Sequence, residues 1–140
     1  MLQNALRDDA WSNTTEGHEL RVGLPWIRSM PLSSIAGLAV KVDGRPVGEE
    51  LRVRLGEREV RPDTLAAEPG WWFIQDRLVL VFPEAVFAAP GRPRRVSVDF
   101  ELMVPYLQGG GGGPLVLPFH LEANLRTTQA PVAGVSRDVA

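Results

Sequence analysis

The sequence predicts an all-β protein, a single-domain antiparallel β-sandwich of jelly-roll type with at most short helices. Three observations support this fold class. Short apolar runs recur roughly every ten residues, Pro and Gly separate most of them, and no helical pattern lasts longer than about two turns. At 140 residues, the chain is long enough to bury a core without metals or disulfides.

The predicted sandwich occupies residues 18–126. Residues 1–17 are polar and form an N-terminal arm in this interpretation. Within the arm, residues 2–11 favour a short helix or an extended segment, and residues 13–17 favour a loop. Residues 127–140 are small or polar, and we expect them to form a disordered C-terminal tail.

Alternating or continuous apolar patterns predict the strands of the sandwich. In chain order they lie at residues 18–24, 38–42, 51–55, 58–60, 71–74, 78–82, 96–104, 115–118 and 119–126. The run at 78–82 is apolar throughout, which is typical of a strand buried on both faces. Pro105 is expected to end the strand before it, because proline cannot donate a ladder hydrogen bond.

The connections between these strands carry recognisable turn residues. Asp43-Gly44 predicts a tight hairpin turn, because Gly adopts the positive φ that such a turn needs. Residues 75–77 predict a second turn, and residues 62–67 are the best helical candidate after the N-terminal arm. The run Gly109–Gly113 is a flexible tether by composition, since it lacks the Lys and the helix start of a phosphate-binding loop.

Residues 24–35 are neither a regular helix nor a regular strand. Pro25 and Pro31 each remove a backbone donor and push the preceding residue toward extended geometry. Apolar side chains alternate here with Arg28 and Ser29, so an ordered loop would need packing on both sides. Two interpretations stay open: a buried crossover whose Trp26 fills the core, and an interface or ligand rim.

Composition excludes several classes of function. The chain has no Cys, so disulfides, thiolate metal sites and a Cys nucleophile are excluded. The formal net charge of −2 and the lack of a basic tract argue against nucleic acid as a partner. No apolar run approaches the length of a membrane span, and the N-terminus lacks the layout of a signal peptide. We therefore expect a soluble, cytoplasmic protein.

His120 and Glu122 are the first candidates for chemistry. They lie two residues apart and so share one face of a strand. Two side chains are too few for a metal site and nothing brings His18 near them, so we assign this chain no metal ligands and no catalytic residues. Arg126 lies on the same face, which makes an ion-pair ladder the simpler interpretation.

The four tryptophans, Trp11, Trp26, Trp71 and Trp72, are more informative. Adjacent residues of a strand point to opposite faces. One of Trp71 and Trp72 should therefore lie inside, while the other faces water or a partner. This pattern favours an interaction surface over an active site.

Several motifs resemble those of one protein family. They are Leu24-Pro25-Trp26 with Arg28-Ser29 and Pro31-Leu32-Ser33, the Asp43-Gly44 turn, Trp71-Trp72 with Gln75-Asp76, and Pro105-Tyr106 followed by Gly113-Pro114. With these motifs in this order, the sequence resembles the β subunits of bacterial C-glycoside deglycosidases from about Glu19 to Arg126. Two features depart from the family pattern: Ile27 stands where an aromatic residue is usual, and the run Gly109–Gly113 is an elaboration of this chain.

The resemblance implies a small all-β subunit that assembles with a larger, sugar-isomerase-like TIM-barrel α subunit. It implies a lyase of carbohydrate metabolism that cleaves the C–C bond between an aglycone and a 3-oxo sugar. The ketone acidifies the proton at C2, a base removes it, and a metal stabilises the enolate as the aglycone leaves C1. The resemblance places the divalent metal, typically manganese, and the acid–base residues in the α subunit.

For this chain, the resemblance implies a non-catalytic role in shaping or bracing the partner's active site. The candidate contacts with the partner or with a 3-oxo C-glycoside substrate are Trp26, Arg28, Ser29, Trp71, Trp72 and Tyr106. The alternative from another class is a free-standing carbohydrate-binding sandwich whose tryptophans stack on sugars. A third alternative is an enzyme with its own active site on the face of His120 and Glu122.

Overall fold

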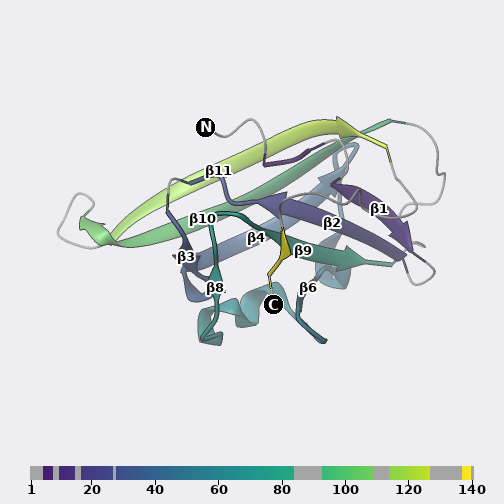
Figure 1. Ribbon diagram of the computed structural model, residues 1–140. Helices are drawn as coiled ribbons and strands as arrows, with labels where there is room; N and C mark the ends of the chain where they lie inside the picture. Colours follow the sequence, from purple (N-terminus) through teal and green to yellow (C-terminus); the bar gives the residue numbers. More distant parts are fainter. Residues whose placement is uncertain are drawn as a thin grey trace.

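The structure is a computed structural model that describes residues 5–7, 10–14, 17–26, 28–83, 93–108, 114–126 and 137–139. It confirms the predicted all-β fold, because two largely antiparallel sheets form the layers of a sandwich (Figure 1). The helical segments of the described residues are short 3-10 helices, namely η1 (Leu32–Ser34), η2 (Gly48–Glu50) and η3 (Pro62–Ala67). None of these helices is long and apolar enough to cross a membrane.

The larger sheet is built around a fully buried central strand. Its strands follow the order β1 (Trp11–Thr14), β2 (Gly17–Gly23), β9 (Asp76–Phe82), β6 (Arg52–Leu55) and β7 (Arg58–Val60), and β12 (Arg137–Asp138) pairs in parallel with β9. Every residue of β9 is buried. The prediction of a strand buried on both faces is therefore confirmed, and this strand holds the layer together.

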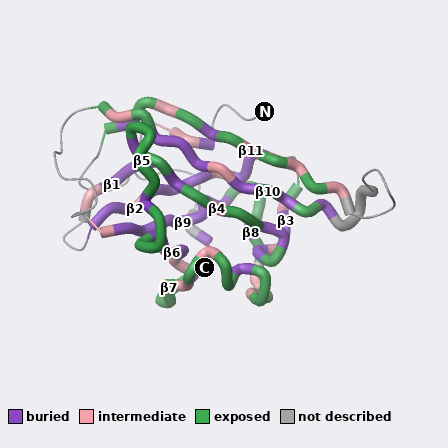
Figure 2. Tube along the Cα trace, turned by 180° about the vertical axis from the view of Figure 1, so that it is seen from behind, coloured by how far each residue is buried: buried purple, intermediate pink, exposed green. Residues whose placement is uncertain are grey.

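The smaller sheet contains the longest strands. Its order is β11 (Pro114–Leu125), β10 (Arg94–Gln108), β4 (Ile35–Val42) and β5 (Arg45–Pro46). Alternate residues of β10 from Val96 to Val104 are buried in the core. Exposed and buried positions alternate most clearly from Phe100 to Val104, and Figure 2 shows the strand coloured by burial. A separate two-stranded ladder joins β3 (Met30–Pro31) to β8 (Trp71–Trp72).

The predicted Asp43-Gly44 turn is confirmed. It joins β4 to β5 as a two-residue hairpin, with φ of 53° at Asp43 and 81° at Gly44. Positive φ at both central residues is the geometry whose twist matches the flanking strands. The Asp43 carboxylate also accepts a hydrogen bond from the Arg95 amide at 3.0 Å, which fastens the turn to β10.

The larger sheet extends beyond the predicted range 18–126 at its N-terminal side. Asn13 and Thr14, predicted as loop, pair with His18 and Gly17 as part of β1. The prediction was wrong because β1 lacks alternation. Its polar residue Ser12 is fully buried and accepts a hydrogen bond from Arg21 at 3.3 Å.

The C-terminal end of the chain also contributes to the fold. Residues 127–136 of the predicted tail lie outside the described residues. Beyond them, β12 pairs with Asp76 and Arg77 of β9, and the Val139 amide donates to the Arg77 carbonyl at 2.9 Å. The Val139 side chain is buried in the apolar core. Residues 137–139 are therefore a strand with a core anchor, where the sequence predicted a tail.

Two strand ends differ from the prediction. The strand predicted at 71–74 ends at Trp72, and Asp76 and Arg77, predicted as turn, begin β9. The cause is a tight turn in which the Asp76 amide donates to the Phe73 carbonyl at 2.9 Å.

At the other strand end, β10 continues through Pro105 to Gln108. Its ladder with β11 skips from Val104 to Gln108, so the missing proline N–H breaks no ladder hydrogen bond. The run Gly109–Gly113 that follows lies outside the described residues.

The anchoring role of Val139 can be tested by substitution. Val139→Ala removes two buried methyl groups, so we expect the free energy of unfolding to fall by about 1–2 kcal/mol. Denaturant unfolding of the full chain measures this change. Val116→Ala is the matched control: Val116 is 48% exposed, and its substitution should change stability by less than about 0.5 kcal/mol. Equal stability of both variants would contradict the packing of residues 137–139.

Candidate functional site

The ladder between β3 and β8 brings together two segments that sequence analysis singled out separately. Met30 lies opposite Trp72, and Pro31 lies opposite Trp71. Beside this ladder, the Ile74 amide donates to the Ser29 hydroxyl oxygen at 2.8 Å, across 45 residues of sequence. The proline-rich loop and the tryptophan pair therefore form one continuous part of the molecule.

The two adjacent tryptophans point in opposite directions, as predicted. Trp72 is only 1% exposed, and its indole N–H donates to the Asp76 carbonyl at 3.1 Å. Its ring also lies 5.9 Å from the ring of Phe100 in the core. Trp71, by contrast, is 48% exposed. The prediction that one ring would be inside and the other outside is confirmed.

Trp71 is accompanied by two further exposed apolar residues. Phe73 is 50% exposed and Ile74 is 49% exposed. We call Trp71, Phe73 and Ile74 the Trp71 surface. The predicted strand at 71–74 places Phe73 on the face of Trp71 and Ile74 on the inward face of Trp72, so the exposure of Ile74 is the departure from the prediction. Ile74 does not follow the alternation because β8 ends at Trp72, before the turn that leads to β9.

Hydrogen bonds hold the backbone of the Trp71 surface at three points. The Leu32 amide donates to the Gly70 carbonyl at 3.0 Å, just before the surface begins. The bonds of Ser29 and Asp76 described above hold its middle and its end. Large apolar side chains on a fixed backbone lose little entropy when they are covered, which is typical of a protein interface.

Trp26 and Arg28 lie close together in the sequence but differ in burial. Trp26 is half-buried and meets Phe119 edge-on, with ring centroids 6.3 Å apart. Phe119 stacks on Phe100 at 5.5 Å, so a series of rings runs from Trp26 through the core to Trp72. Arg28 is exposed. Tyr106 contributes its backbone to β10, and its side chain lies outside the described residues.

The face of His120 carries an ion-pair ladder across β10 and β11. His120 Nδ1 lies 2.5 Å from a carboxylate oxygen of Asp99, and His120 Nε2 lies 3.6 Å from Glu122. Glu122 also pairs with Arg95 at 2.6 Å. The predicted ladder is therefore present, but its basic member is Arg95 of the adjacent strand and not Arg126.

The ladder does not resemble a metal site. The two imidazole nitrogens of His120 face different carboxylates, so the three side chains do not converge on one point. Among the residues described here, no group of three or more His, Asp or Glu side chains could hold a metal ion. The hydrogen bond to Asp99, with smaller contributions from its charge and from Glu122, raises the pKa of His120 above its ordinary value.

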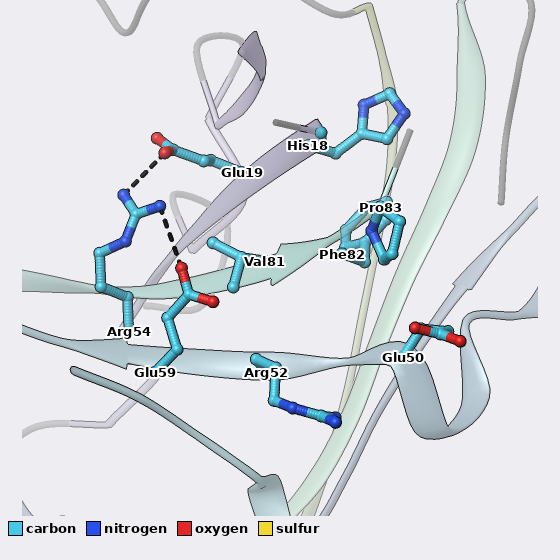
Figure 3. Close-up of a pocket in the computed structure, with 10 residues that line it drawn as sticks. His18, Glu19, Glu50, Arg52, Arg54, Glu59, Val81, Phe82 and Pro83 are labelled. Carbon is cyan, nitrogen blue, oxygen red and sulfur yellow. Dashed lines mark ion pairs between the residues drawn. The ribbon is translucent and has the colours of Figure 1, made fainter. Parts of the chain in front are cut away.

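A polar groove of about 250 Å³ opens beside β2, β6, β7 and β9 (Figure 3). Five charged residues line it: Glu19, Glu50, Arg52, Arg54 and Glu59. The Arg54 guanidinium lies between Glu19, at 2.7 Å, and Glu59, at 3.6 Å. No pattern in the sequence predicts this groove, because its residues come from separate segments that only the sheet order brings together.

Sequence comparison with known proteins shows the family to which this chain belongs. No family model matches the chain. A protein of Arthrobacter globiformis named C-glycoside deglycosidase beta subunit is 37% identical over 90 residues, which cover 63% of this chain and 68% of that protein. The chain belongs to the C-glycoside deglycosidase β subunit family. The resemblance stated from the motifs is thereby confirmed.

Two further members of the family match over longer stretches. The 3'-dehydrocarminate deglycosidase beta subunit of a Microbacterium species is 32% identical over 98 residues, covering 68% of this chain and 72% of that protein. The C-glycoside deglycosidase beta subunit of Microbacterium trichothecenolyticum is 33% identical over 107 residues, with 75% and 76% covered. A β subunit, by its name, belongs to an assembly with a partner subunit.

The His120 ladder predicts a pH dependence with a definite sign. Because the pKa of His120 is raised in the folded protein, its stabilising contribution is full below the ordinary value of 6.5 and is lost as the pH rises through the raised pKa. Asp99→Asn should therefore return the pKa of His120 toward 6.5, as measured by NMR titration of the imidazole. Glu101→Gln, on the same strand but outside the ladder, is the control. An unchanged His120 pKa in Asp99→Asn would contradict the ladder.

Proposed function

We propose that this chain is the non-catalytic β subunit of a metal-dependent C-glycoside deglycosidase, a lyase that cleaves the C–C bond between an aglycone and 3-oxo-glucose. Its partner in this proposal is a sugar-isomerase-like TIM-barrel α subunit in the cytoplasm. Membership of a family whose members are named deglycosidase β subunits carries the proposal.

The division of labour between the subunits follows from the chemistry of the reaction. Removal of the C2 proton next to the 3-oxo group needs a base, and the resulting enolate needs a positive charge beside it. The proposal assigns the base and the divalent metal, typically manganese in the family pattern, to the α subunit. This chain supplies a fixed surface that braces or shapes the partner's site.

The Trp71 surface is the proposed contact with the α subunit. Burial of the exposed half of Trp71 or Phe73 would remove roughly 100 Å² from water, which is worth about 2 kcal/mol for each ring. Ser29 contacts this surface through the Ile74 amide, and the exposed Arg28 precedes it on the same loop. Trp26 and Trp72 support it from the core side through the series of rings.

The proposed contact is tested by weakening it without unfolding the chain. Trp71→Ala combined with Phe73→Ala should raise the dissociation constant of the complex at least about 30-fold, the loss expected for interface hot spots. Surface plasmon resonance with the purified α subunit measures the change, and circular dichroism checks that the variant is folded.

The control for this experiment uses exposed apolar residues elsewhere. Met103→Ala combined with Val116→Ala removes side chains of similar exposure from the outer face of the smaller sheet. This variant should bind the α subunit as the natural chain does. If it loses affinity while the Trp71 and Phe73 variant keeps it, the interface lies on the smaller sheet and the proposed contact is wrong.

The proposed reaction is tested by co-expressing this chain with a sugar-isomerase-like protein encoded beside it. The two should co-elute from a sizing column, and the complex should release aglycone from a 3-oxo C-glucoside while neither chain does so alone. Chelation should abolish the release, and Mn²⁺ should restore it. A chain that stays monomeric and binds glycans by itself would instead support a free-standing carbohydrate-binding module.

A further inference from the structure

The groove beside β2, β6, β7 and β9 is separate from the Trp71 surface. Figures 1 and 2 place β3 and β8 at one end of the sandwich and the paired ends of β1 and β2 at the other. Gly17 and His18, at that second end, line the groove. The groove and the Trp71 surface therefore share no residues.

One wall of the groove is a fixed network of charges. Arg54 bridges Glu19 and Glu59 (Figure 3). Glu19 also pairs with Arg21 at 3.0 Å. The side chains of Arg21 and Glu19 are only 7% and 12% exposed, so the sheet holds them in place. A ligand would meet charges that are already oriented, which lowers the cost of binding.

The rest of the groove presents donors and acceptors that the protein does not use. Arg52 Nη1 donates to the Glu49 and Leu51 carbonyls, at 2.6 and 2.9 Å. Its other guanidinium N–H groups have no acceptor among the described residues. Glu50 likewise has no partner within this part of the chain, and Glu59 uses one carboxylate oxygen only.

This mixture of groups selects a class of ligand. An anion would be repelled by Glu50 and Glu59, and a cation would be repelled by Arg52 and Arg54. A hydroxyl group both donates and accepts, so it can satisfy carboxylates and guanidinium groups at once. Val81 adds an apolar wall for a C–H face. The volume of about 250 Å³ suits a molecule smaller than a typical drug.

We propose that this groove binds a small, neutral, polyhydroxylated molecule of the size of a monosaccharide. Arg52 donates to its hydroxyl oxygens, and Glu50 and Glu59 accept from its hydroxyl hydrogens. This inference does not depend on the proposed function, because it rests on residues of this chain away from the Trp71 surface.

The test is an NMR titration of the full, ¹⁵N-labelled chain with D-glucose. We expect saturable shifts of the backbone amides around Arg52, Glu59 and Val81, with a dissociation constant in the millimolar range. Glu50→Ala combined with Glu59→Ala should weaken binding at least about 100-fold, because two hydrogen bonds to charged groups are lost. Spectral dispersion shows whether each variant is folded.

The matched control is Glu57→Ala, which removes an exposed carboxylate two residues from Glu59 and outside the groove. This variant should bind glucose as the natural chain does. The absence of saturable shifts, or equal binding by the double variant, would overturn the proposal. Tighter binding of D-glucosamine or D-gluconate than of glucose would also overturn it, because the groove would then select a charge.

Discussion

The burial of Trp72 is the interaction on which the candidate interface depends. A buried indole N–H costs free energy unless it finds an acceptor, and here the Asp76 carbonyl supplies one at 3.1 Å. That hydrogen bond spans the turn after β8, so it fixes both the inward ring and the chain direction that follows it. Because neighbouring strand residues face opposite ways, the inward position of Trp72 places Trp71 outside. The exposed surface is thus a consequence of a core contact.

Most of the fold could be predicted from local pattern. The continuous apolar run of β9, the alternation of β10 and β11, and the Asp43-Gly44 hairpin each follow from side-chain period or turn chemistry. Within the described part of the chain, four short strands were missed: β1, β3, β5 and β12. They exist because a neighbouring strand offers them hydrogen bonds. Such pairing is a property of the whole sheet and leaves no local pattern.

Only those parts of the candidate site that follow from local pattern could be predicted from the sequence. Trp71 and Trp72 could be assigned to opposite faces, since that follows from strand geometry alone. Ile74, by contrast, is exposed because of a turn that the Asp76 amide closes. The groove charges meet only through the order β2, β9, β6, β7. The family of the chain, by contrast, could be recognised from motif order before any of these contacts was known.

The ladder between β3 and β8 has a consequence for how the protein matures. It joins residues some forty positions apart, and contacts of large sequence separation form late, after much of the chain has collapsed. Until residues 29–32 meet residues 70–76, Trp71, Phe73 and Ile74 have no common scaffold. A half-made or misfolded chain would therefore lack the proposed contact surface, and a partner that binds there would select completely folded chains.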